Sequence, residues 1–456
     1  MRNNRLLTIL FSLSLLTLTG CPQETGQYGD NGNGVATSDD VDTPVNGKDE
    51  TQSQTSQATP AADPDPPELV KSLEDSGAMI TRDGNGLITG LSYYDGKASI
   101  PVADADLADL HQLKKLQKLR LFGRDITDVG LDHIVKIESL KDLTLEKTGV
   151  TDQGMVTIQS MPNLAALNLP YASIGPDGIE AIAQIPKLRV LQLLRTLTDD
   201  ESLAKLAGKT TLASLDLRDT SVTDDGLVHL KDLNQLKSLK LSTDRISSRG
   251  MEHLKDLTNL TSLQLDLSAV GDEGLDYLQG LSNLQELYLY KTQVSDLSKL
   301  TAFPNLRVLR LRETFVSDES MEHLKGLEKL ENLDLSETAV GDAGIEQIKS
   351  LPNLKRLNLW FSLVTDAGLK PIGEMQGLTW LNLDKTTITD AGLADLAPLQ
   401  NLKWMHIGSN NLTDACVDHV GQLKSLGELI ITFNPGISTA GQEKLQAELP
   451  DCKIQF

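Results

Sequence analysis

The chain has 456 residues, a formal net charge of −22 at pH 7 and an aromatic content of only 4%. This acidity argues against a nucleic-acid binder, which needs a basic face to neutralise phosphates. The three cysteines exclude a disulfide scaffold, and no C-x-x-C pair points to a zinc or redox site.

The first twenty residues (1–20) have the pattern of a secretory signal. Arg2 and Arg5 form a positive start, and the apolar run at 6–18 is too short to span a bilayer comfortably. We therefore predict a signal peptide that takes no part in the fold.

The end of this run, Leu18-Thr19-Gly20-Cys21, resembles the bacterial lipobox. The resemblance implies cleavage before Cys21 and lipidation of that cysteine. Pro22 in place of an aspartate implies, by the sorting rule of lipobox proteins, an anchor in the outer membrane or at the cell surface. The alternative is an ordinary signal peptide followed by an incidental cysteine.

Residues 21–67 are predicted to be a lipid-anchored, disordered acidic linker. From residue 22 onward they hold nine acidic side chains and one lysine, Lys48, with almost no large apolar residue. Such a stretch buries too little surface to offset its chain entropy. The glycines at 29–34 have no strand before them and no helix after them, so they do not indicate a phosphate-binding loop.

Residues 68–113 are predicted to form an N-terminal cap. A small hairpin is expected at 80–94, turning around Asp83–Gly86, with a first helix at about 104–113.

Residues 114–440 repeat one phrase. An L-x-L pair, in places Met or Ile for Leu, occurs fourteen times with a period of 24 residues, apart from one 22-residue step between Leu287 and Leu309. Alternate residues of a strand point the same way, so the leucines face a core and their neighbours face out. The V/I-T-D-x-G-L phrase that follows indicates the start of a helix.

This pattern resembles the leucine-rich repeat. The resemblance implies an α/β solenoid, a horseshoe with a parallel β-sheet on its concave face and helices on its convex face. The composition is similar to the ribonuclease-inhibitor and F-box-associated repeat classes, in a bacterial form; no F-box-like segment precedes the repeats, so no ubiquitin role is implied. Residues 441–456 are predicted to be a C-terminal cap, made of a last helix and a closing strand.

Repeated Asp and His residues raise the question of a metal site. One Asp per repeat, beginning with Asp128, is interpreted as a helix cap, because calcium needs several oxygens that converge on one point. His229 and His253 fall on the convex helix and are interpreted as solvated. Cys416 and Cys452 are expected to be packed. No H-E-x-x-H, G-x-S-x-G or Walker motif is present, so we expect no enzyme activity, metal or cofactor.

The inner face carries the informative signal. All three tryptophans of the chain fall beside core leucines in three consecutive repeats, with tyrosines and arginines nearby. Exposed Trp, Tyr and Arg are the usual anchors of a binding surface. Alternatively, these rings only stack along the sheet, or a tail covers them. The candidate ligand-binding residues are Tyr288, Tyr290, Arg310, Arg312, Arg356, Trp360, Trp380, Trp404 and His406.

We therefore expect a non-enzymatic binding protein of the cell envelope, which holds a protein partner or an envelope glycan on its concave face. Contact with the membrane would be through the N-terminal lipid only, and nucleic acid is not expected. The alternative is a structural scaffold or spacer of the envelope without a specific ligand.

Overall fold

The computed structural model describes residues 64–94, 96 and 99–456. The predicted signal peptide, the predicted lipidation site Cys21 and nearly all of the acidic linker lie outside these residues. Within the described part of the chain, no helix has the length and apolar character that a membrane crossing requires.

The strands of the described residues form one 17-stranded sheet, in which each strand pairs with its neighbour in the chain. β1 and β2 form an antiparallel hairpin, and the later pairings are parallel. Leu119 pairs with Leu143, and Leu287 pairs with Leu309 across the short step, so the predicted leucine ladder is confirmed. The strands are β1 Met79–Arg82, β2 Ile88–Ser92, β3 Lys118–Phe122, β4 Asp142–Glu146, β5 Ala166–Asn168, β6 Val190–Gln192, β7 Ser214–Asp216, β8 Ser238–Lys240, β9 Ser262–Gln264, β10 Glu286–Tyr288, β11 Val308–Arg310, β12 Asn332–Asp334, β13 Arg356–Asn358, β14 Trp380–Asn382, β15 Trp404–His406, β16 Glu428–Ile430 and β17 Lys453–Gln455.

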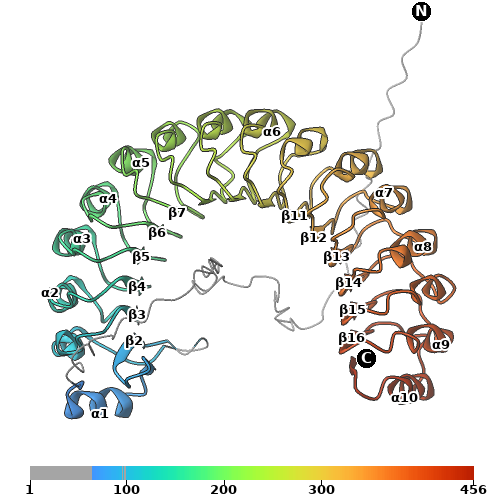
Figure 1. Cartoon of the computed structure of the whole chain (residues 1–456), viewed down its shortest axis with the longest axis horizontal. Coiled ribbons are helices and arrows are strands. Elements are labelled where there is room, and N and C mark those ends of the chain that lie inside the picture. Colours follow the sequence, from blue (N-terminus) through green and yellow to red (C-terminus); the bar gives the residue numbers. More distant parts are fainter. Residues whose placement is uncertain (1–63, 95, 97–98) are drawn as a thin grey trace, which may run out of the picture. The chain divides into compact units, whose positions relative to one another are not determined.

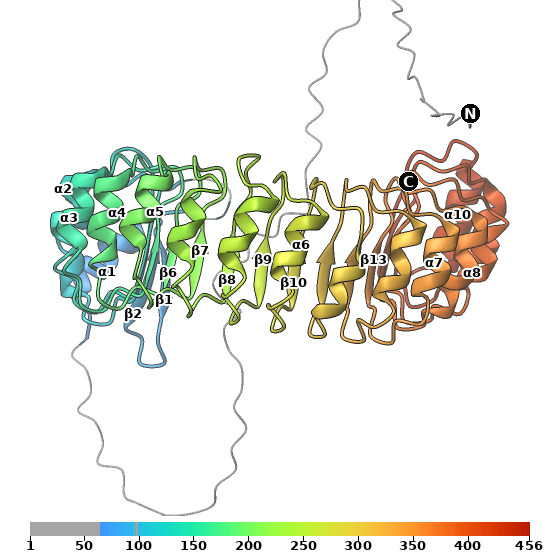
Figure 2. The ribbon, with the colours of Figure 1, turned by 90° about the horizontal axis from the view of Figure 1, so that it is seen from above.

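Helices lie on the opposite side of each coil from the strands, and the coils stack along a curve whose inner side is lined by the sheet (Figures 1 and 2). The α-helices are α1 Pro67–Asp75, α2 Asp128–Ile134, α3 Asp152–Ile158, α4 Pro176–Ala183, α5 Asp200–Leu206, α6 Asp272–Leu278, α7 Asp342–Ile348, α8 Asp366–Glu374, α9 Val417–Val420 and α10 Thr439–Glu448. The 3-10 helices are η1 Asp104–Leu107, η2 Leu110–Gln112, η3 Gly226–Leu230, η4 Ser248–Leu254, η5 Ser298–Ala302, η6 Asp318–Leu324, η7 Gly392–Leu396 and η8 Asp414–Cys416.

Two features of the N-terminal region differ from the sequence-based expectation. Helix α1 was not predicted, and the single helix expected at about 104–113 is two 3-10 helices, η1 and η2, closed by bonds such as Asp106 N–H to the Ala103 carbonyl. Segments of three or four residues are too short for a regular α-helix, and the tighter i→i+3 bonding is usual there.

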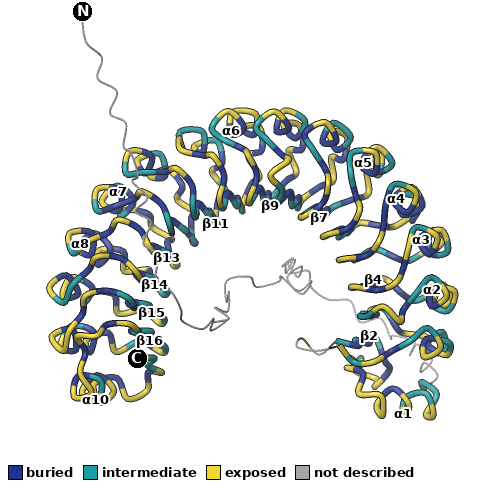
Figure 3. The backbone as a smooth tube through the Cα atoms, turned by 180° about the vertical axis from the view of Figure 1, so that it is seen from behind, coloured by how far each residue is buried: buried dark blue, intermediate teal, exposed yellow. Residues whose placement is uncertain are grey.

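The core lies between the sheet and the helices, as the dark band in Figure 3 shows. Both leucines of each L-x-L pair are buried, and apolar residues of the helix and of the returning segment pack against them. The stack therefore has one continuous hydrophobic core, which is the arrangement that leaves the residues between the leucines on the inner surface.

A threonine closes the turn behind several of the strands. Thr338 donates its hydroxyl to the Leu335 carbonyl at 2.6 Å, and Thr386 donates to Leu383 at 2.8 Å. Asn434, at the same position near the C-terminus, donates to two coils at once, through the carbonyls of Ile407 and Ile431, both at 3.0 Å. A hydroxyl therefore makes fewer bonds at this position than an amide does.

The repeated aspartate does not cap its own helix, which corrects the sequence-based interpretation. The cap is the preceding threonine: Thr151 accepts a hydrogen bond from the Gln153 N–H. Asp128 instead binds the next coil. One of its carboxylate oxygens accepts the Thr151 N–H at 2.8 Å, and the other accepts the Thr151 hydroxyl at 2.6 Å. Most of the repeated aspartates therefore fasten one coil to the next, and their charge also faces the N-terminus of a helix. Asp296 is an exception, because it accepts the N–H and the hydroxyl of Ser298 in its own coil.

This fastening explains the glycine of the D-x-G phrase. A Cβ on Gly154 would overlap the Asp128 carboxylate and come within 2.6 Å of Leu131 Cδ1. Ser202 replaces the glycine where the preceding coil has Pro176 instead of an aspartate. Cys416 also replaces the glycine, although the preceding coil has its aspartate, Asp390. The helix there begins with the 3-10 turn η8.

The chain leaves most strands through a left-handed residue that is not glycine. The second residue after the L-x-L pair has φ between 48° and 62° in twelve coils, among them Tyr171, Arg195, Phe361 and Lys385. Such a backbone is costly by about 1–2 kcal/mol, and the stacked turns on either side hold it in place. As a result, side chains at this position stand along one edge of the inner face.

Candidate functional site

The nine candidate residues lie where the alternation of the strands predicts, on the inner face. Tyr288, Arg310, Arg356, Trp380, Trp404 and His406 belong to strands β10, β11, β13, β14 and β15, and Tyr290, Arg312 and Trp360 come two residues after a strand. None of the three indoles belongs to the hydrophobic core, and each is half-buried on the surface. The structure groups them into two rows and a pair.

The first row crosses the strands β13, β14 and β15. Parallel register places Arg356, Trp380 and Trp404 next to one another. The Arg356 guanidinium lies 4.5 Å from the Trp380 ring centre, and the Trp380 and Trp404 rings stack 4.3 Å apart with their planes 2° from parallel. Both faces of Trp380 are therefore covered, one by a cation and one by a second indole.

His406 closes this row. Its ring meets Trp404 edge-on at 5.9 Å, and its Nε2 lies 3.7 Å from Asp384 Oδ1, an atom that makes no hydrogen bond. Burial lowers the pKa of His406, and the nearby Asp384 carboxylate opposes that shift.

The second row runs through the residues that follow the strands. Arg312 lies 5.0 Å from the ring centres of both Tyr290 and Trp360, and its Nε donates to Glu337 at 2.7 Å. Lys385, which was not among the candidates, approaches Trp360 at 5.2 Å from the next coil. The Trp360 ring thus lies between two cations that come from opposite directions along the stack.

The remaining pair is Tyr288 and Arg310. The Arg310 guanidinium lies 5.1 Å from the Tyr288 ring centre, and the Tyr288 hydroxyl donates to Glu286 at 3.2 Å. Burial, followed by the charge of Glu286, raises the pKa of Tyr288 to about 12. The phenol is therefore a neutral donor at physiological pH.

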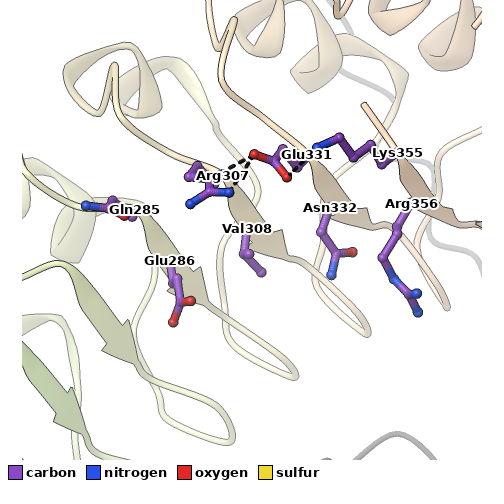
Figure 4. A pocket seen from close by; sticks show the side chains of 8 residues that line it. All are labelled: Gln285, Glu286, Arg307, Val308, Glu331, Asn332, Lys355 and Arg356. Atoms are coloured by element: carbon purple, nitrogen blue, oxygen red, sulfur yellow. Dashed lines mark hydrogen bonds and ion pairs between the residues drawn. The ribbon is translucent and has the colours of Figure 1, made fainter. Parts of the chain in front are cut away.

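A shallow hollow of about 300 Å³ opens beside the first row. It lies over strands β10 to β13 and is drawn in Figure 4. At its rim Glu331 bridges two cations, with Arg307 at 2.7 Å and Lys355 at 3.0 Å. Asn332 and Arg356 extend into it side by side from neighbouring strands.

A further aromatic and cationic row lies at the N-terminal end of the inner face and was missed from the sequence. Tyr94 stacks on Phe122 at 5.4 Å, Lys147 lies between Phe122 and Tyr171, and Arg195 lies 5.5 Å from the Tyr171 ring centre. Three of these five residues occupy the left-handed position after the strand. Reading that column of the repeat, as well as the columns beside the leucines, would have found them.

The chemistry available on this face is that of binding. Within the residues the structure describes, no group of three or more His, Cys, Asp or Glu side chains is arranged to hold a metal ion. The surface offers guanidinium and amide donors, carboxylates in some of the coils, and the edges of stacked rings. Arginine and aromatic side chains of this kind are the groups that dominate protein interfaces.

Comparison with known proteins identifies the fold. A family model described as a leucine-rich repeat region matches residues 287–454, and a second leucine-rich repeat model matches residues 208–231 and 256–278. The fold is that of a leucine-rich repeat solenoid. No curated protein sequence matches it.

Solved structures of other proteins are similar to this chain. A leucine-rich repeat protein of Leptospira interrogans is 23% identical, with a TM-score of 0.55, over 85% of this chain and 98% of that one. An internalin from Listeria monocytogenes is 18% identical, with a TM-score of 0.47, over 85% of this chain and 94% of that one. At such identities the likeness concerns the fold alone.

Proposed function

We propose that this chain is a non-enzymatic recognition protein that binds a protein partner on the C-terminal half of its inner face. Proteins built from leucine-rich repeats generally mediate protein–protein recognition. The observation that carries the proposal is the cluster of Trp360, Trp380 and Trp404 with Arg312 and Arg356, which are half-exposed and held in fixed rows by one another. A surface whose anchors are already ordered loses little side-chain entropy on binding.

The geometry of the rings favours a protein over a glycan. A sugar packs its C–H groups against an open, electron-rich ring face. Both faces of Trp380 and of Trp360 are occupied by neighbouring side chains, so these indoles offer their edges. Ring edges, guanidinium groups and amides suit the mixed apolar and polar surface of a protein.

We further propose that the chain is an envelope lipoprotein anchored through Cys21. The support is the residue pattern at 1–21, with its positive start, apolar run and lipobox-like end. Mass spectrometry of the mature N-terminus tests this, since an unmodified cysteine there would remove the anchor. The 24-residue coils with convex helices also support the ribonuclease-inhibitor-like repeat class.

The binding proposal is tested by site-specific photocrosslinking in the cells that make the protein. A photoreactive residue at Asn382, which lies between Asn358 and His406 in the register, should give a discrete adduct with a partner protein. The same residue at Ser238, on β8, is the matched control and should give none. Trp404→Ala in the Asn382 background should weaken the adduct severalfold.

Two outcomes would overturn the proposal. Equal adducts from Asn382 and Ser238 would favour the alternative of an envelope spacer with no specific ligand. An adduct at Asn382 that is indifferent to Trp360→Ala, Trp380→Ala and Trp404→Ala would remove the aromatic rows from the binding surface.

A further inference from the structure

On the strands of the inner face, Arg310 and Arg356 differ from Arg120, because they have no carboxylate partner. Five arginines on or beside this face have a carboxylate partner: Arg120 with Glu146, Arg195 with Asp219, Arg218 with Asp216, Arg307 with Glu331 and Arg312 with Glu337. Within the part of the chain that the structure describes, Arg310 and Arg356 have neither an ion pair nor a hydrogen bond from the side chain, and each only lies over an aromatic ring.

These two cations are close enough to repel each other. They lie on β11 and β13, which are separated by a single strand and so by roughly 10 Å. Burial, followed by the positive charge of Arg310, lowers the pKa of Arg356. Asp266 attracts Arg310 from beyond ion-pair distance, and its carboxylate oxygens accept hydrogen bonds from Gln264 and from the Tyr290 N–H. Two like charges that are partly removed from water without an ion-pair partner are unfavourable, and a bound anion would relieve the repulsion.

The carboxylates nearby are directed elsewhere. Asp334, directly opposite Arg310 in the register, accepts the N–H and the hydroxyl of Ser336 at 3.0 and 2.6 Å. Glu286 accepts from Ser262 at 2.8 Å and from Tyr288 at 3.2 Å. Neither carboxylate lies within ion-pair distance of the two arginines.

An uncharged donor lies on the strand between them. Asn332 begins β12, and its side-chain amide has no hydrogen-bond partner among the residues the structure describes. The Asn332 and Arg356 side chains extend together into the hollow over β10 to β13 (Figure 4). The site therefore presents two guanidinium groups and one amide that have no internal partner.

We propose that this site binds a carboxylate of the partner, an aspartate or glutamate side chain in an acidic segment of a protein. Arg356 and Asn332 would donate to the carboxylate, Arg310 would supply a second positive charge, and apolar side chains next to it in the partner would pack on the edges of Trp380 and Trp404. This inference rests on the proposed function, because it names the chemistry of the partner at the same surface.

The charge of the whole chain makes such a site selective. With a net charge of −22, most of the molecule repels an acidic segment. Attraction would be confined to the strip around Arg310 and Arg356, so the register of the bound segment would be set there. Complementarity of this kind contributes more to specificity and to the rate of association than to affinity alone.

The experiment uses the full chain and an array of synthetic peptides printed in pairs, each acidic peptide beside the same sequence with Asn for Asp and Gln for Glu. The chain should bind acidic members that also carry an aromatic or branched apolar residue, and should bind their amide twins about tenfold more weakly, which corresponds to about 1.4 kcal/mol. Arg310→Gln and Arg356→Gln should each remove most of that preference. Arg189→Gln is the control and should keep it. Arg189 is exposed, directly precedes β6 and has no ion pair among the described residues, and its replacement changes the net charge equally.

The outcomes separate this inference from the proposed function. If acidic peptides and their amide twins bind equally well while Trp404→Ala abolishes binding of both, the carboxylate site is wrong and the recognition surface stands. If Arg189→Gln weakens binding as much as Arg356→Gln, the effect is general electrostatics and the site is again wrong. Arg356→Glu gives an independent check, because a true site should then prefer peptides with Lys in place of Asp or Glu.

Discussion

Trp380 and Trp404 lie face to face, 4.3 Å apart and 2° from parallel, although 24 residues separate them in the chain. The stack exists because parallel register brings identical positions of successive coils together. An aromatic pair of this geometry contributes about 0.5–1.5 kcal/mol beyond its buried area. The indoles therefore stabilise the sheet as well as offering their edges to a partner.

This stack should give an optical signal. Two indoles stacked face to face at this distance couple their electronic transitions, so the absorption of the indole band should be lower in the folded chain than in the chain unfolded in urea. Trp380→Phe and Trp404→Phe should each abolish this hypochromism. Trp360→Phe is the control and should leave it unchanged, because Trp360 lies between Arg312 and Lys385 and next to no other indole.

The stability that the aspartate contributes by bonding to the next coil should be measurable at Asp342 and Thr365. Asp342 accepts the N–H and the hydroxyl of Thr365 at 2.8 and 2.6 Å. Asp342→Ala leaves both donors without this acceptor, so the free energy of unfolding should fall by about 1–3 kcal/mol in urea denaturation. Asp244→Ala, an exposed aspartate with no side-chain bond, should change it by less than about 0.5 kcal/mol. Equal effects would show that the coils do not depend on this contact.

A double-mutant cycle should reveal why glycine follows the aspartate. Gly154→Ala places a methyl group against the Asp128 carboxylate and should destabilise the fold by about 1–3 kcal/mol. In the Asp128→Ala background the same change should cost clearly less, since the carboxylate is gone. Additive losses would mean that the glycine is required for a reason other than this contact.

The sequence was sufficient for the fold because the leucine period leaves a single register. A slip of one residue would turn every leucine of a strand out of the core, so alternation alone placed Trp360, Trp380 and Trp404 on the inner face. Some details of the coils were not predictable. The bonds from Asp128 to Thr151, for example, join residues of neighbouring coils, and only the stacked structure shows which groups meet.

The contacts within the candidate site also needed the structure. Arg312 contacts Tyr290 in the neighbouring coil and also reaches Trp360, two coils away. It can do so because the coil between Arg312 and Trp360 presents Ser336, a small side chain turned toward Asp334. Rotamers decide such contacts, and a repeat pattern does not specify rotamers. The row through Tyr94 and Tyr171 was missed because it uses the left-handed position of the turn.

Cys416 in the repeats and Cys452 in the C-terminal cap should be unreactive in the folded protein. Burial, followed by the charges of Asp390 and Asp414, raises the pKa of Cys416 to about 12. Burial also raises the pKa of Cys452. Since the thiolate is the nucleophile, a Cys21→Ser chain should resist a thiol reagent at neutral pH and should react fully once unfolded in urea. Rapid labelling of the folded chain would contradict the packing at these positions.

His406 should make the stability of the fold depend on pH. Burial is the larger influence and lowers its pKa below the ordinary value of 6.5, although Asp384 opposes the shift. As the pH falls through 6.5, the unfolded chain takes up a proton that the folded chain does not, so the free energy of unfolding decreases until the folded pKa is passed.

His406→Gln should remove this contribution. The difference in unfolding free energy between the wild-type chain and the variant, measured in urea on both sides of pH 6.5, should be constant above that pH and should move against the wild type below it. Asp384→Asn should make the loss on acidification larger, because the carboxylate that favours the charged imidazole is then gone. If the difference in unfolding free energy instead moves in favour of the wild type at low pH, then Asp384, and not burial, determines the direction of the pKa shift of His406.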